Sequence, residues 1–322
     1  MTENLEDYAL QKQEHKKGSL KQVGIIGCGT MGQEIAIVTS QHGIDVVFVD
    51  LTEERIEEVF IEISKSLDEV ISKWGMTKSE KKAILSRIAG STDYSSIKDC
   101  DLVIETINSR KPGTNIESRK DVFRKVEAVV RRDTVIASNT STLNITDLAS
   151  VLEYPDRAVG FHFLSPASSV KLAEVVKGLK TSEESYDFVI KFAKMVEKKV
   201  ITLHESPGNI STRLIVTLIN EACETLMEGV ASTQCIDETM KLGFGLQFGP
   251  LEMADRIGLD KVIKWMDNLY QEFGELNFKP NPVLKRLYRS GHIGKKSGTG
   301  FYKYKDGKVV GETVVCPEFN IE

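Results

Sequence analysis

The chain has 322 residues, of which 41% are hydrophobic and 28% are charged, with a formal net charge of −5. This length predicts two domains. The mild acidity argues against a nucleic-acid partner, because such proteins present a basic face. No apolar run approaches the roughly 18 residues of a membrane helix, so we expect no membrane partner.

Residues 1–20 mix acidic and basic side chains around no apolar centre, unlike a signal or transit peptide. We interpret them as a polar tail. The five cysteines include no Cys-x-x-Cys pair, which favours a reducing compartment over a disulfide framework. The sequence therefore predicts a cytoplasmic protein, and we expect no metal site.

The stretch 23–50 predicts a dinucleotide-binding unit. A short apolar run is followed by the turn Gly27, Gly29, Thr30, Met31 and Gly32, by a helix to about residue 40, and by a second apolar strand that ends at Asp50. Glycines permit the tight turn, the close approach of a pyrophosphate and helix–strand packing. A carboxylate at Asp50 suits ribose hydroxyls and repels a 2′-phosphate, so NAD is favoured over NADP.

A helical hairpin is predicted over about 52–88, longer than a simple strand connection needs. On pattern alone it is as compatible with a purely structural role as with ligand binding. Ser66 and Lys73 are seven residues apart and thus on one helix face, where they could meet an extended anionic ligand.

The remaining chain predicts a Rossmann-type doubly wound α/β sheet over 21–205, then an all-α domain over 206–322. Pro207-Gly208 marks the linker. The first helix of the all-α domain, 210–227, is apolar nearly all round, so we expect it to be buried. The apolar excess of this domain also predicts a homodimer. Further strands are expected at 101–105, 134–137, 158–163, 171–176 and 199–203, and further helices to 131 and at 183–198, 233–241, 251–272 and 281–290.

Hydride transfer from an alcohol to NAD needs a base, and histidine is the usual one because its pKa lies near neutrality. Of five histidines, only His162 follows a buried strand in a segment with other polar groups. Glu174 comes twelve residues later and could orient the imidazole and stabilise its charged form. A structural histidine beside an unrelated glutamate remains open from spacing alone.

Several motifs together resemble the 3-hydroxyacyl-CoA dehydrogenase family, most of all 3-hydroxybutyryl-CoA dehydrogenases. The resemblance covers residues 21 to about 305 in order. The motifs are Gly27-Cys28-Gly29-Thr30-Met31-Gly32, Ser138-Asn139-Thr140-Ser141, Gly160-Phe161-His162-Phe163, Lys171-Leu172-Ala173-Glu174, Gly249-Pro250-Leu251-Glu252-Met253-Ala254-Asp255 and Gly294-Lys295-Lys296-Ser297-Gly298-Thr299-Gly300-Phe301-Tyr302.

The resemblance implies NAD-dependent oxidation of an L-3-hydroxyacyl-CoA, such as 3-hydroxybutyryl-CoA, to the 3-ketoacyl-CoA and the reverse, in fatty acid or butanoate metabolism. It makes His162 the base, Glu174 its partner and Ser141 a contact to the substrate oxygen near the nicotinamide. It also implies cofactor contacts from Asp50, Arg119 and Lys296 and CoA contacts from Ser66 and Lys73.

Three positions depart from the family pattern. An active-site Asn is Ser165, expected on the cofactor side, and a second Asn is Thr212, expected to contact substrate. Ser109 replaces a Glu. Hydroxyls reach less far than amides, so the binding of the thioester could differ. Two alternatives stay open: a dehydrogenase of another 3-hydroxy acid or thioester, and a weakly active NAD- or CoA-binding protein.

Overall fold

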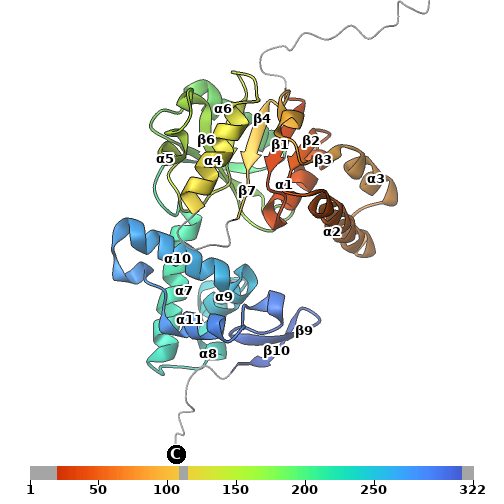
Figure 1. The fold of residues 1–322 in the computed structure, drawn as a ribbon. Helices are drawn as coiled ribbons and strands as arrows, with labels where there is room; N and C mark the ends of the chain where they lie inside the picture. The colour runs from red at the N-terminus through yellow and green to blue at the C-terminus, as the bar shows by residue number, and fades with distance from the viewer. Residues whose placement is uncertain (1–19, 109–114, 314–322) are drawn as a thin grey trace, which may run out of the picture.

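The computed structural model describes residues 20–108 and 115–313 (Figure 1). The expected tail, apart from residue 20, and Ser109 lie outside them. The described chain has two lobes with separate apolar cores. Two core clusters, one on each face of a large sheet, draw their buried residues only from 23–196, and a third draws them only from 216–302.

An eight-stranded sheet in the order β3-β2-β1-β4-β5-β6-β7-β8 organises the first lobe. The first six strands of that order are mutually parallel, β7 is antiparallel to β6, and β8 is parallel to β7. The strands are β1 Gln22–Ile26, β2 Asp45–Val49, β3 Ile88–Ser91, β4 Leu102–Glu105, β5 Val135–Ser138, β6 Ala158–Phe163, β7 Leu172–Lys177 and β8 Lys199–His204.

Helices cover both faces of this sheet, which explains why its central strands are continuous apolar runs. One face packs against α1 (Thr30–Gln41) and α6 (Glu183–Met195). The other packs against α4 (Asn115–Glu127) and α5 (Ile145–Ala149). The predicted doubly wound fold is confirmed.

The helical hairpin consists of α2 (Glu53–Ser72) and α3 (Lys78–Ser86) and projects from the edge of the sheet (Figure 1). The Thr52 hydroxyl accepts the Arg55 N–H at the start of α2, and Thr77 forms a capping box with Glu80 at the start of α3. The prediction ran the second helix to residue 88 and missed edge strand β3. Of its four residues only Ile88 is buried, so it carries little apolar pattern.

The second lobe is helical, as predicted, and ends in a two-stranded hairpin. Its expected helix 251–272 is two helices, because the chain turns at Gly258, whose φ is +100°. The expectation of an all-α domain missed the hairpin. The elements are α7 Ser211–Met227, α8 Thr233–Phe244, α9 Pro250–Ile257, α10 Leu259–Phe273, α11 Pro282–Arg289, β9 Tyr302–Lys305 and β10 Lys308–Glu312.

Helix α7 is buried along one face only, so the expectation of burial all round is wrong for this single chain. Val216, Ile219 and Cys223 are fully buried, whereas Leu214 is 67% exposed. In the described part of the chain, every helix is too short or too polar to cross a bilayer.

Candidate active site

The glycine turn after β1 has the form that a dinucleotide site requires. Gly27 has a φ of +83°, and a Cβ there would lie 2.7 Å from Ile107 Cγ2. A Cβ on Gly32 would lie 2.6 Å from the Gly27 carbonyl oxygen, so α1 could not pack as closely. A Cβ on Gly29 would meet no atom within 4 Å. Two glycines thus serve packing, and the third faces open space where a pyrophosphate can approach the backbone.

The start of α1 follows Gly29, which offers no side-chain cap to the first N–H groups. Such N–H groups and the positive end of the helix dipole suit phosphate. Asp50, just beyond β2, accepts the Cys28 N–H at 2.9 Å and the Leu51 N–H at 2.8 Å. These residues fit a bound dinucleotide. Thr30 is exposed and Met31 is half-buried at the same turn.

Arg55 lies across this turn, which the sequence did not indicate. Its guanidinium donates to the Cys28 carbonyl at 3.3 Å, to Glu58 at 2.9 Å and to Glu62 at 3.0 Å. The hydrogen bond to Glu62 is the main reason that the pKa of Arg55 is raised. Two carboxylates therefore already engage Arg55, as suits an NAD site without a 2′-phosphate.

His162 and Glu174 face each other across the antiparallel strands β6 and β7. The His162 Nδ1 and the Glu174 Oε2 are 2.8 Å apart, and the residues are 7% and 2% exposed. Directly opposed residues of antiparallel strands project from the same face, so the pairing follows from strand register. Glu174 is therefore the hydrogen-bonding partner of His162 and not an unrelated glutamate nearby.

The start of α7 also holds Glu174. Its Oε1 accepts the Ile210 N–H at 3.2 Å and the Ser211 N–H at 2.9 Å, and its Oε2 accepts the Ser211 hydroxyl at 2.7 Å. Burial alone would raise the pKa of Glu174. The hydrogen bonds from His162 and Ser211 outweigh burial, and the net pKa lies below its ordinary value. The carboxylate is thus kept ionised beside the imidazole.

The loop after β5 carries Ser141, which is 8% exposed. The Thr140 hydroxyl accepts the N–H groups of Thr142 and Leu143 at 3.4 and 3.3 Å. Asn139 Oδ1 accepts the Phe163 N–H at 2.8 Å, next to His162. These bonds fix the Ser141 loop against the end of the strand that carries the histidine.

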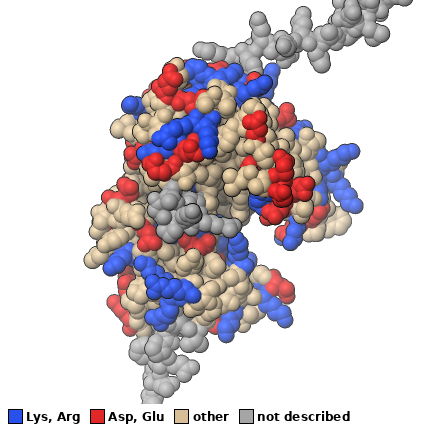
Figure 2. All heavy atoms as spheres, in the orientation of Figure 1, with Lys and Arg blue, Asp and Glu red and all other residues tan. Residues whose placement is uncertain are grey.

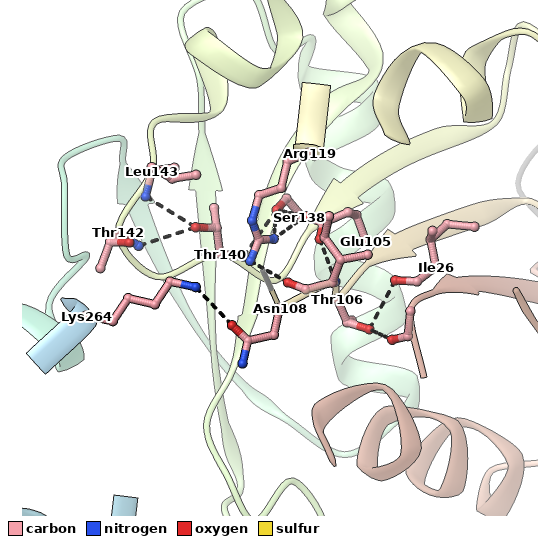
Figure 3. A network of polar contacts seen from close by, with 12 residues as sticks. Ile26, Glu105, Thr106, Asn108, Arg119, Ser138, Thr140, Thr142, Leu143 and Lys264 are labelled. Carbon is pink, nitrogen blue, oxygen red and sulfur yellow. Dashed lines mark hydrogen bonds and ion pairs between the residues drawn. The ribbon is translucent and has the colours of Figure 1, made fainter. Parts of the chain in front are cut away.

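A buried ion pair lies beside the same loop (Figure 3). The carboxylate of Glu105 pairs with Arg119 and accepts the Ser138 hydroxyl at 2.6 Å. Arg119 also donates to the Ile107 carbonyl at 2.8 Å. Arg119, predicted to contact the cofactor, is thus engaged at the carboxyl ends of β4 and β5. The central role of Glu105 was missed, because in sequence it is only the last residue of an apolar strand.

Helix α10 of the second lobe meets these loops. Lys264 Nζ donates to Asn108 Oδ1 at 3.0 Å, as Figure 3 shows, and Asn268 Nδ2 donates to Thr142 Oγ1 at 2.9 Å. Burial, followed by the nearby charge of Arg119, lowers the pKa of Lys264. The polar loops at the carboxyl end of the sheet therefore face the second lobe directly.

Ser165 lies in the loop after β6 and donates to Glu34 Oε1 at 2.9 Å. Glu34 Oε2 accepts the Ala167 N–H at 2.7 Å, and the buried Lys198 donates to the carbonyls of Ala167 and Val170. The loop that follows His162 is thus tied to α1, whose start forms part of the glycine turn.

The other predicted residues are more dispersed. Ser66 and Lys73 are exposed on the hairpin, Lys73 directly after α2. Lys296 is exposed in the short 3-10 turn Lys295–Ser297 of the second lobe. Thr212 is 2% exposed in the first turn of α7, one residue after Ser211.

Two family models match nearly all of the described chain. Residues 22–206 match the NAD-binding domain of 3-hydroxyacyl-CoA dehydrogenase, and residues 208–304 match its C-terminal domain. This chain belongs to the 3-hydroxyacyl-CoA dehydrogenase family. It is therefore an oxidoreductase, and its cofactor is NAD.

Relatives of this 3-hydroxyacyl-CoA dehydrogenase support the assignment along almost the whole chain. A 3-hydroxybutyryl-CoA dehydrogenase of Clostridioides difficile is 37% identical over 282 residues, which cover 88% of this chain and 99% of that protein. A mitochondrial hydroxyacyl-coenzyme A dehydrogenase of Sus scrofa is 36% identical, with coverages of 90% and 93%. The crystal structure of (S)-3-hydroxybutyryl-CoA dehydrogenase from Ralstonia eutropha matches with a TM-score of 0.81 at 37% identity, and covers 89% of this chain and 100% of that one.

Proposed function

We propose that this dehydrogenase interconverts an L-3-hydroxyacyl-CoA, with 3-hydroxybutyryl-CoA as the reference substrate, and the corresponding 3-ketoacyl-CoA. The observation that carries this proposal is the buried pair of His162 Nδ1 and Glu174 Oε2, 2.8 Å apart. Relatives named for 3-hydroxybutyryl-CoA support the short acyl group.

The tautomer of the histidine follows from its partner. An ionised carboxylate only accepts hydrogen bonds, so His162 Nδ1 carries the proton that it donates to Glu174. The Nε2 atom then has a free lone pair and takes the proton of the substrate hydroxyl. Glu174 stabilises the imidazolium that forms. Bound NAD supplies the acceptor for the hydride that leaves C3.

Three hydroxyl residues orient the two ligands. Ser141 contacts the substrate oxygen, Thr212 binds the thioester side, and Ser165 serves the cofactor side. Two of these are hydroxyls where the family pattern has an amide. An unchanged His–Glu pair with shorter side chains around it favours the same reaction with a modified fit to the acyl group.

The hairpin is proposed as the CoA site. Ser66 and Lys73 are exposed on it, and Figure 2 shows basic side chains, beside acidic ones, over its outer part at the right of the view. Lysines bind phosphate groups as point charges. Those described as exposed or half-exposed on the hairpin are Lys65, Lys73, Lys78, Lys81 and Lys82.

The decisive experiment is NADH oxidation with acetoacetyl-CoA. We expect the wild type to turn over this substrate. We expect kcat to fall about 10²–10⁴-fold in His162→Gln, because that factor is the usual contribution of general acid–base catalysis. His204→Gln, at an exposed histidine, is the matched control and should keep full activity. Wild-type turnover that His162→Gln leaves unchanged would remove the mechanism.

The same assay separates the alternatives. An NAD- or CoA-binding protein would bind both ligands without turnover. A dehydrogenase of free 3-hydroxy acids would oxidise DL-3-hydroxybutyrate at least as well as its CoA thioester.

The remaining proposals concern assembly. We propose a domain boundary near 205/206, supported by the separate cores, and a cytoplasmic homodimer formed through the second lobe. Exposed apolar side chains support the dimer, because a second copy would cover them. Sedimentation should give twice the chain mass. These side chains are Leu214, Met227, Val230, Leu242 and Phe244.

A further inference from the structure

Glu174 Oε2 receives two side-chain hydrogen bonds at once. One comes from His162 Nδ1 at 2.8 Å and the other from the Ser211 hydroxyl at 2.7 Å. Ser211 is the first residue of α7, directly after the linker between the lobes. Neither the sequence motifs nor the proposed mechanism uses this hydroxyl.

The hydroxyl is separable from the groups that hold the carboxylate in place. The other oxygen, Oε1, accepts two backbone N–H groups, those of Ile210 and Ser211. Those bonds persist whatever side chain stands at 211. Removal of the hydroxyl therefore leaves Glu174 anchored and changes only the electron density shared at Oε2.

We propose that Ser211 is a positioning residue that sets the basicity of the His162–Glu174 pair by sharing Glu174 Oε2 with the imidazole. The inference rests on the proposed roles of those two residues. A donor to a carboxylate stabilises its charge and leaves less of it for a neighbouring cation. The Ser211 hydroxyl thus lowers the basicity of the pair, and its removal should raise the pH at which the pair takes up a proton.

The other elements packed around Glu174 contribute little charge of their own. Its partner in β8 is Ile201, which is apolar. On α7, the Arg213 guanidinium stacks 4.5 Å from the centroid of the Phe273 ring. On β7, Lys177 pairs with Glu183. Burial raises the pKa of the Glu174 carboxyl, and the hydrogen bonds that lower it come from His162 and Ser211.

The test is the pH profile of kcat/KM for oxidation of L-3-hydroxybutyryl-CoA in Ser211→Ala. The acidic limb should move to higher pH by about 0.5–1 unit, the worth of one hydrogen bond. Activity below the limb should fall about three- to tenfold, while the plateau above it should change little. For acetoacetyl-CoA reduction, which needs the protonated pair, the basic limb should also move to higher pH. The same pair takes up or releases the proton in both directions of the reaction. A C3-deuterated substrate checks that hydride transfer limits the rate.

Ser211→Thr, which keeps the hydroxyl, should restore the wild-type profile. Ser211→Cys offers a weaker donor of similar size and should give an intermediate shift, so the proposal stays testable if the alanine variant is unstable. A profile lowered uniformly, with its limb unmoved in both Ala and Cys variants, would overturn the proposal and assign Ser211 a structural role. If His162→Gln were fully active, the proposed function would fail instead.

Discussion

At the scale of single residues, the site depends on how one carboxylate is held. Glu174 is buried yet ionised, because four donors, one from the neighbouring strand β6 and three from the start of α7, converge on its two oxygens. A buried carboxylate without such donors would be neutral and could not stabilise an imidazolium. Ser211 and the backbone N–H groups at the start of α7 thus connect the second lobe to the catalytic pair.

A double-mutant cycle tests whether His162 and Glu174 act as a unit. Glu174→Gln should lower kcat by the same factor as His162→Gln or less, because an amide can donate to Nδ1 and favour the wrong tautomer. The double variant should be little worse than the worse single variant, since groups that act as a unit are not additive. Steady-state kinetics measures all three. Multiplied losses in the double variant would show two independent roles.

At the scale of elements, the hairpin of α2 and α3 connects two proposed binding sites. Arg55 near the start of α2 lies on the glycine turn, whereas Lys73 stands just past the other end. The 20-residue helix therefore spans from the cofactor loop to the proposed CoA site. The helix is longer than a connection between two strands needs. CoA contacts along it would account for the extra length.

Replacement of Lys73 by Ala tests this role. The KM for acetoacetyl-CoA should rise severalfold, because loss of a phosphate contact weakens binding without touching the reacting centre. The KM for NADH should not change, and acetoacetyl-pantetheine, which lacks the nucleotide, should be insensitive. Lys180→Ala, at an exposed lysine of the first lobe outside the hairpin, is the matched control. Equal effects on both thioesters would make the hairpin contact structural.

At the scale of the whole molecule, two buried carboxylates hold the second lobe together. Asp237 accepts the Leu251 and Glu252 N–H groups at the start of α9. Asp255 accepts the Phe301 and Tyr302 N–H groups and so ties α9 to the terminal hairpin. Burial raises the pKa of Asp255 to about 6, against the hydrogen bonds that lower it.

This raised pKa predicts a pH-dependent stability. Between pH 3.8 and about 6 the folded state binds a proton at Asp255 that the unfolded chain has lost. The contribution of this proton to the free energy of unfolding is therefore complete below the pKa of the unfolded chain. This contribution, about 3 kcal/mol, is lost as the pH rises through about 6. Asp255→Asn mimics the protonated form, so the stability advantage of wild type over the variant should shrink from pH 4 to pH 7.

Urea unfolding of both proteins at several pH values measures that difference. The comparison between variants is needed because other groups act oppositely. The lowered pKa of Glu174, for example, contributes stability above its unfolded pKa that is lost as pH falls. A gap between wild type and Asp255→Asn that is the same at pH 4 and pH 7 would contradict the assignment.

Local sequence determined much of this fold. The glycine turn, the apolar strands and the capped helices follow from φ angles, backbone crowding and hydrophobic period, which act over a few residues. The His162–Glu174 pairing was also within reach, because two neighbouring strands joined by a short loop bring residues twelve apart face to face. The roles assigned to these residues remain predictions.

Only the tertiary structure decided the rest. Edge strand β3 has too little apolar pattern to predict, and α7 keeps an exposed face that we expected to be buried. The pairing of Glu105 with Arg119 and the hydrogen bond from Ser211 to Glu174 join segments 14 and 37 residues apart. Hydrophobic periodicity predicts which side of a helix or strand is buried. It does not predict which distant polar group contacts that helix or strand. That choice depends on how the sheet, the loops and the second lobe pack together.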